Sequence, residues 1–261
     1  GTPAVQALTS KLHEDKVPGT SPGFGIAASA DGVRYPFLFP VAATYWSQTA
    51  AAVKFVKDKL GGNLAGKKIA YIFYDNPAGR EPLPVLEELQ KIEKFEMKIF
   101  AVPAPGLEMG PQVLDIADRF QADFVIAHLF GRAPSVSIKE FKRVGYPLSK
   151  VVSFVWGSTD SDIDAAGGFA MAEGYYTMHF AGVGTDYPIL KEIVDMYKAQ
   201  GKPAPKEMQY TVYYNRGLLW IALNVEAVRN AIKAKGGQMP TSEDVKAGFE
   251  QIKKLPVGDI A

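Results

Sequence analysis

Apolar positions in the middle of the chain alternate between two patterns. Nearly continuous apolar runs predict buried strands, and stretches with apolar residues at helical spacing lie between them. The strand-like runs are KKIAYIFYD (67–75), EMKIFAVPA (96–104), ADFVIAHL (122–129), KVVSFVW (150–156) and AEGYYTMHF (172–180). The helical stretches are 80–94, 111–121 and 135–145. Strands that are apolar on both faces and alternate with helices are typical of a doubly wound, parallel α/β sheet.

The two ends of the chain follow a different pattern. Residues 4–15 and 45–60 have helical spacing, and a short apolar run at 36–41 lies between them. Beyond Gly184 three helical stretches (187–200, 207–235 and 241–253) follow without a strand. Because these helices need a surface to cover, we expect residues 1–43 and 183–255 to form a first lobe and residues 44–182 a second lobe.

Composition narrows the possible partners. The 261 residues are 47 % hydrophobic, enough for one large or two small cores, and 29 basic against 28 acidic residues give a net charge of +1. No charge excess favours nucleic acid, and no apolar run approaches the roughly 20 residues of a membrane span. The chain has no cysteine, which excludes disulfides and thiolate metal sites but leaves the compartment open. Gly1 is not an initiator methionine, so we expect any signal peptide to have been removed or to lie outside this sequence.

Two short motifs suggest enzymes but do not fit them. GTSPG (19–23) matches the nucleophile elbow of hydrolases, yet the residue after Ser21 is Pro22, which has no N–H for an oxyanion. GFGIAA (23–28) matches a dinucleotide fingerprint but lacks the preceding strand and following helix. Its glycines instead indicate either a loop that approaches a ligand or an ordinary turn.

The three histidines, His13, His128 and His179, lie on different predicted elements. Their spacing gives no metal site, so we expect neither metal nor cofactor. His179 falls inside a predicted strand and is interpreted as a core or lobe-junction residue. His128 follows a strand, where α/β proteins bind ligands, but no partner acid or nucleophile accompanies it, so we expect no catalysis.

Three successive strands end in polar or aromatic loops. These are YDNPAGRE (74–81), HLFGRAPS (128–135) and WGSTDSD (156–162). Since the carboxyl ends of parallel strands share one edge, we expect a binding pocket there. WGSTDSD can equally cap the helix that follows it, and the two interpretations are compatible.

The whole chain resembles the periplasmic solute-binding proteins of the leucine/isoleucine/valine-binding family, which serve ABC importers. The order of its segments carries the resemblance: GTPAVQAL, PFLFPVAATYWSQTAAAVKFV, KKIAYIFYDNPAGRE, ADFVIAHLFGRAPSVSIKEFKRVGY, AAGGFAMAEGYYT and QYTVYYNRGLLWIALNVEAV. The family implies two doubly wound α/β lobes joined by crossover hinges, with residues 256–261 beginning a third crossing. Relative to the family, we expect the first lobe to be incomplete at both chain ends.

The resemblance also implies a set of ligand-binding residues. From the first lobe these are Thr2, Ser21, Gly23, Phe24 and Gly25, near Gly1 and in the Ser21–Gly25 stretch. From the second lobe they are Tyr45, Trp46, Asn76, Ala78, Gly79, His128, Phe130, Arg132, Trp156, Ser158, Thr159 and Asp160.

The class of ligand follows from how these residues depart from the family pattern. The acidic residue that holds a ligand ammonium is displaced to Asp160, and Ala78 stands where an aromatic is frequent. Aromatic side chains crowd the expected cleft, and His128 and Arg132 could neutralise a carboxylate or bond a phenolic oxygen. We therefore expect a small carboxylate, with an aromatic acid slightly favoured over a branched-chain amino acid.

The expected function is capture of this ligand by a periplasmic monomer that delivers it to the membrane permease of an ABC importer. The alternatives are an α/β enzyme, either a hydrolase or a nucleotide-dependent enzyme, and a regulator of the same binding fold. An enzyme would need an activated nucleophile or a phosphate loop. A regulator would need a helix-turn-helix segment. The sequence shows none of these.

Overall fold

The computed structural model describes residues 1–21, 25–157 and 159–260. Their contacts divide the chain into two compact units, which we describe separately. Unit 1 consists of residues Gly1–Thr44 and Phe180–Ala261, and unit 2 of Tyr45–His179. None of the helices within the described ranges is both long and apolar enough to cross a membrane.

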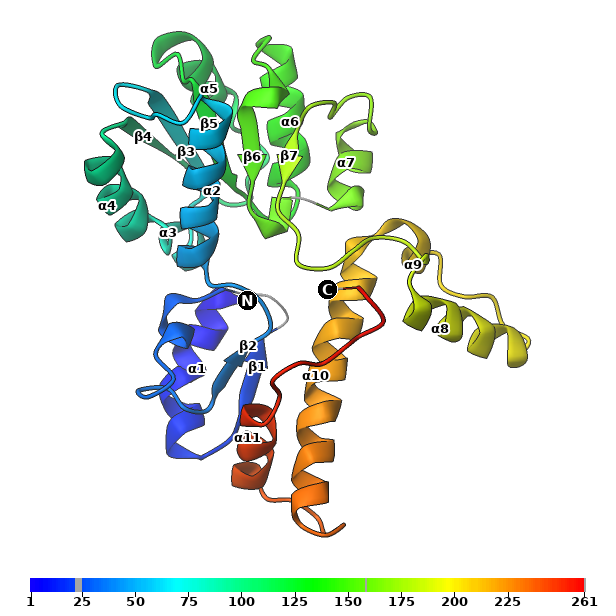
Figure 1. Ribbon diagram of the computed structural model, residues 1–261. Coiled ribbons are helices and arrows are strands. Elements are labelled where there is room, and N and C mark those ends of the chain that lie inside the picture. Colours follow the sequence, from blue (N-terminus) through cyan, green and yellow to red (C-terminus); the bar gives the residue numbers. More distant parts are fainter. Residues whose placement is uncertain (22–24, 158, 261) are drawn as a thin grey trace. The chain divides into compact units, whose positions relative to one another are not determined.

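Unit 2 is built around a five-stranded parallel sheet (Figure 1). The strands lie in the order β4-β3-β5-β6-β7. In the central register, Ile72 of β3 lies opposite Phe100 of β4 and Ala127 of β5. The bounds are β3 (Lys68–Tyr74), β4 (Glu96–Val102), β5 (Phe124–His128), β6 (Val151–Ser153) and β7 (Tyr176–Thr177).

Helices cover both faces of this sheet, which explains the continuous apolar runs. On one face α2 (Tyr45–Lys59) and α4 (Leu83–Glu93) pack on Tyr71 and Phe73. The opposite face, with Ala70 and Ile72, is covered by helical segments that follow β4, β5 and β6. These are α5 (Gly110–Leu114), the π-helical turn η2 (Asp115–Arg119), α6 (Ala133–Arg143) and α7 (Asp160–Ala166).

Three short helical segments complete unit 2. They are α3 (Pro77–Arg80), η3 (Leu148–Lys150) and η4 (Val155–Gly157). Alternate side chains of each strand enter opposite cores, so both faces of a strand are apolar. Burial of one such side chain, for example Ile72, stabilises the fold by about 1.5–3 kcal/mol. The predicted doubly wound parallel sheet is confirmed.

Unit 1 has a smaller sheet and a larger share of helix. Its strands β1 (Gly19–Ser21) and β2 (Leu38–Pro40) pair in parallel. The Trp220 indole N–H donates to the Thr20 hydroxyl at 2.8 Å, which ties β1 to the long helix α10. The helical segments are α1 (Thr2–Glu14), η1 (Ala27–Ala30), α8 (Pro188–Ala199), α9 (Glu207–Tyr210), α10 (Val212–Ala234) and α11 (Ser242–Glu250).

Three predicted boundaries are wrong. The strand expected over 172–180 is reduced to the two residues of β7, and His179 lies beyond it with an exposed side chain. The strand expected over 150–156 ends at Ser153 because the chain turns into η4. The helix expected over 207–235 breaks at Thr211, whose hydroxyl caps α10 by accepting from the Tyr213 N–H.

Candidate functional site

The carboxyl edge of the unit 2 sheet contains a topological switch point. The chain leaves β3 towards β4 with α4 on one face, and it leaves β5 towards β6 with α6 on the other face. Connections that diverge in this way open a crevice at the carboxyl ends of the two strands, and doubly wound proteins bind ligands there. Phe73 of β3 lies opposite His128 of β5 at this point.

The loop after β3 is held by its own side chains. Asn76 caps α3, and its side-chain oxygen accepts from the Gly79 N–H at 2.9 Å. A Cβ on Gly79 would overlap the Tyr74 carbonyl oxygen, so this position requires glycine. Ala78 and Gly79 are both buried, and the loop therefore has a fixed shape before any ligand arrives.

A buried chain of hydrogen bonds links this loop to β5. The Tyr71 hydroxyl donates to the Gly79 carbonyl at 2.7 Å and lies 3.2 Å from His128 Nδ1. A carbonyl only accepts and a hydroxyl has one proton, so the Tyr71 proton points to Gly79 and Nδ1 donates to the Tyr71 oxygen. This assigns the proton of the neutral imidazole to Nδ1.

The His128 ring is neutral and its second nitrogen is unpaired. The ring is 0 % exposed, and burial lowers the pKa of His128 to about 3. Nε2 is then a lone-pair acceptor, and it has no hydrogen-bond partner among the described residues. An unsatisfied buried acceptor costs about 1–3 kcal/mol of stability.

Aromatic rings surround this imidazole. The ring centroids of Tyr45, Phe154 and Phe130 lie 4.5, 4.6 and 4.8 Å from that of His128. Tyr45 is the first residue of α2, Phe154 follows β6 and Phe130 follows β5. Three elements thus place an apolar enclosure around one polar atom.

The loop after β6 joins the same cluster through Trp156. Its indole N–H donates to the Tyr45 hydroxyl at 2.9 Å. Thr159 forms a capping box with Asp162 at the start of α7, so the capping interpretation of this loop is confirmed. The Asp160 Oδ2 atom is buried and without a hydrogen-bond partner among the described residues.

Two predicted site residues of unit 2 stand apart from this cluster. Trp46 is 43 % exposed and its indole N–H donates to the Glu81 carbonyl at 2.9 Å. Arg132 has an exposed side chain just before α6, and it forms no ion pair within the part of the chain that the structure describes.

The predicted residues of unit 1 lie at the start of α1 and the end of β1. Thr2 and Ser21 are each 1 % exposed, and Gly25 is also buried. Gly23, Phe24 and Ser158 fall outside the described residues.

One predicted role is wrong and one residue was missed. His128 cannot neutralise a carboxylate, because burial keeps its imidazole uncharged. Tyr71, absent from the sequence-based set, fixes the tautomer of His128 and anchors Gly79. The available signal was a tyrosine inside an otherwise apolar buried strand, since a buried hydroxyl needs a partner. Within the described ranges no group of three His, Asp or Glu side chains gathers as a metal site.

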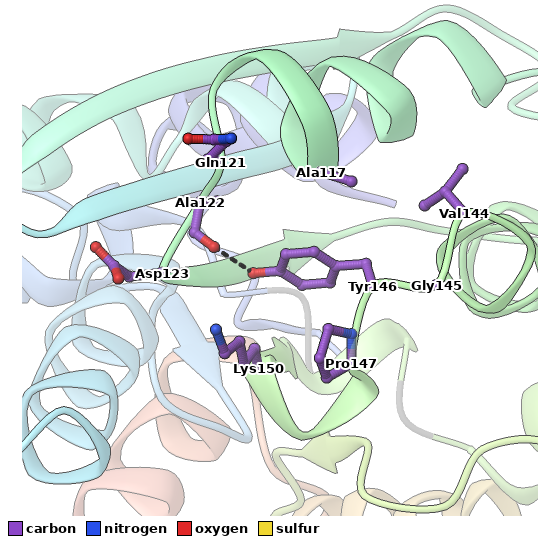
Figure 2. A pocket seen from close by; sticks show the side chains of 9 residues that line it. All are labelled: Ala117, Gln121, Ala122, Asp123, Val144, Gly145, Tyr146, Pro147 and Lys150. Carbon is purple, nitrogen blue, oxygen red and sulfur yellow. Dashed lines mark hydrogen bonds between the residues drawn. The ribbon is translucent and has the colours of Figure 1, made fainter.

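The opposite edge of the sheet has a cavity of about 340 Å³ at the amino ends of β5 and β6 (Figure 2). Two of its polar groups are held by backbone partners. The Tyr146 hydroxyl donates to the Ala122 carbonyl at 2.9 Å, and the Asp123 carboxylate accepts from the Lys68 N–H at 2.8 Å. Burial and the nearby Asp123 charge raise the pKa of Tyr146, so this hydroxyl stays protonated.

Solved structures share this fold. A protein described as an ABC transporter permease from the Pseudomonas fluorescens group is 32 % identical, with a TM-score of 0.82 over 93 % of this chain and 59 % of that one. A branched-chain amino acid ABC transporter protein from Thermus thermophilus with bound valine is 19 % identical, with a TM-score of 0.81 over 97 % of this chain and 64 % of that one.

A solute-binding protein from R. palustris in complex with benzoate is also 19 % identical, with a TM-score of 0.70 over 94 % of this chain and 63 % of that one. The chain therefore spans about six tenths of the length of these three proteins. No curated protein sequence matches the chain.

Residues 1–258 match the family described as periplasmic binding proteins. This match covers nearly the whole chain and includes both units. The resemblance found in the sequence is thereby confirmed, and the chain belongs to the periplasmic binding protein family.

Proposed function

We propose that this protein is an extracytoplasmic solute-binding protein of an ABC importer that captures a small carboxylate, either an aromatic acid or a branched-chain amino acid. The observation that carries the proposal is the convergence of three strand-end loops on one edge of the unit 2 sheet. These loops contribute Gly79, Phe130 and Trp156, with Tyr45 and His128 between them. Apolar walls with a few fixed polar groups are typical of small-molecule sites.

Arg132 supports a negatively charged ligand. Its guanidinium is exposed after β5 and forms no ion pair within the described ranges, so it is available to a carboxylate, which the planar fork of arginine binds well. Relatives described with valine and with benzoate define the ligands to be tested first.

Binding without catalysis fits the same geometry. A general base needs a nucleophile within hydrogen-bond reach, and Nε2 of His128 bonds none among the described residues. Burial also lowers the pKa of His128 to about 3, which makes the imidazole a weak base. Thr2 and Ser21 of unit 1 remain predicted ligand contacts. A ligand shifts the population towards the arrangement that it binds best, and on this proposal a membrane permease recognises that liganded arrangement. The protein acts in the periplasm as a monomer.

A thermal unfolding screen tests this function. The full protein is heated with L-leucine, L-valine, benzoate, cinnamate or phenylacetate, each over a range of concentrations. We expect at least one acid to raise the unfolding temperature in proportion to the logarithm of its concentration, and about 2.7 kcal/mol of stabilisation at one hundred times the Kd. Absence of a shift with every acid, or turnover of an ester or of ATP, would contradict the proposal.

A further inference from the structure

The imidazole of His128 offers one atom that the fold does not use. Its Nδ1 proton is committed to Tyr71, whose own proton is committed to Gly79. Nε2 is left as a buried acceptor without a partner among the described residues. Because Tyr71 fixes the tautomer, this nitrogen can receive a hydrogen bond but cannot donate one.

The three rings around the imidazole differ in burial. Of the three rings around the imidazole, those of Tyr45 and Phe154 are 0 % exposed, while that of Phe130 is half-buried. Phe130 precedes Gly131, which adopts φ +61° in the loop between β5 and α6. Of the three rings, that of Phe130 is therefore the least buried, and it follows the strand end at the switch point between β3 and β5.

We propose that His128 Nε2 accepts a hydrogen bond from an N–H or O–H group of the bound ligand, and that unit 2 thereby selects ligands that carry such a donor beside an apolar body. This inference rests on the proposed function, since it requires a small molecule at this edge. It assigns His128 to ligand selection and not to charge neutralisation. A buried acceptor discriminates strongly, because a ligand without the donor leaves the acceptor unpaired.

The test uses two pairs of ligands that differ mainly in a donor. These are 4-hydroxybenzoate with benzoate, and L-leucine with 4-methylpentanoate. The Kd of each is measured by titration calorimetry on the full protein and on His128→Phe, which keeps an aromatic ring but removes the acceptor. In at least one pair we expect the wild type to prefer the donor-bearing ligand by at least tenfold, and His128→Phe to reduce that ratio by at least tenfold.

Two further variants separate this effect from general damage. Tyr71→Phe releases the tautomer of His128, so it should also reduce the ratio. Tyr146→Phe removes a buried tyrosine hydroxyl at the opposite edge and should leave the ratio unchanged. Equal ratios in the wild type and His128→Phe, with both ligands still bound, would overturn the inference and leave the proposed function intact. Failure of all four ligands to bind would instead count against the proposed function.

The tautomer can be tested without any ligand. Nitrogen-15 NMR of the histidine rings distinguishes a protonated from an unprotonated ring nitrogen. We expect His128 to be protonated at Nδ1 and unprotonated at Nε2 at pH 7. A proton on Nε2 would overturn the inference whatever the binding data show.

Discussion

The two edges of the unit 2 sheet use buried tyrosines in opposite ways. At the amino edge the Tyr146 hydroxyl donates to the Ala122 carbonyl beside a cavity (Figure 2). At the carboxyl edge the Tyr71 hydroxyl donates to the Gly79 carbonyl and accepts a hydrogen bond from His128 Nδ1, while Nε2 of that ring has no partner among the described residues. The tyrosine at the cavity thus ends in a single bond to the backbone, whereas the tyrosine at the carboxyl edge belongs to a chain of bonds that leaves one acceptor unpaired.

This difference shows that cavity volume alone does not locate a site. The cavity at the amino edge follows from how the turns before β5 and β6 pack, and its buried tyrosine serves the fold. The carboxyl edge keeps an unsatisfied acceptor, which destabilises the folded state unless something binds. Residues whose polar atoms are left open by the fold are candidates for function.

The largest expected effect comes from Gly79→Ala. The new Cβ would overlap the Tyr74 carbonyl oxygen, so the loop after β3 must move and the bond from Tyr71 is lost. We expect a loss of about 2–3 kcal/mol in the free energy of unfolding, measured by urea denaturation, and loss of ligand binding. Gly217→Ala is the control, since a Cβ there meets nothing within 4 Å and should change stability by less than about 1 kcal/mol.

Trp156→Ala should weaken binding by about 30-fold, or about 2 kcal/mol. This side chain bonds Tyr45 and contributes to the apolar wall at the carboxyl edge. Trp46→Ala is the matched control, because Trp46 is half exposed and bonds the Glu81 carbonyl instead. Calorimetry with the acid that gives the largest thermal shift measures both. Equal losses of affinity in the two variants would contradict the assignment of Trp156, and not Trp46, to the ligand site.

The pH dependence of stability should change in His128→Phe. In the wild type the folded pKa of His128 is about 3, below the unfolded value of about 6.5. Between these values the unfolded chain binds the extra proton, so stability falls as the pH falls from 6.5 towards 3.

The contribution of His128 to this slope is up to about 1.4 kcal/mol per pH unit. Urea denaturation between pH 4 and 7 should therefore give a shallower slope for His128→Phe than for the wild type. Identical slopes would mean that the imidazole is not neutral and buried.

Arg132→Gln should have the smallest effect, a loss of about fivefold in affinity for a carboxylate, because an exposed ion pair contributes about 1 kcal/mol at most. The loss should shrink as salt is added, since exposed charges are screened. If Arg132→Gln binds the ligand as tightly as the wild type at low salt, the ligand carboxylate is bound elsewhere.

The sequence was sufficient to predict the architecture of unit 2 and the edge that holds the candidate site. Continuous apolar runs such as KIAYIFY have one structural solution when helices alternate with them, a parallel sheet covered on both faces. The strand order then determines where two neighbouring connections leave the sheet in opposite directions, and this point marks the candidate site.

The chemistry of the site could not be predicted in the same way. The bond between Tyr71 and His128 joins residues 57 positions apart, and neither the tautomer nor the uncharged state follows from residue type. The exposed position of Trp46 and the break at Thr211 likewise depend on local packing and capping. The sequence correctly predicted that His128 lies at a strand end. It did not predict that burial keeps the imidazole uncharged.

Hydrogen exchange measured by mass spectrometry tests the central claim most directly. The full protein is compared with and without a saturating amount of the acid that binds most tightly. We predict slower exchange after β3, β5 and β6, in residues 75–81, 128–132 and 155–160, and no change around the cavity at residues 117–123 and 144–150. Protection at the cavity with none in the three loops would contradict the account.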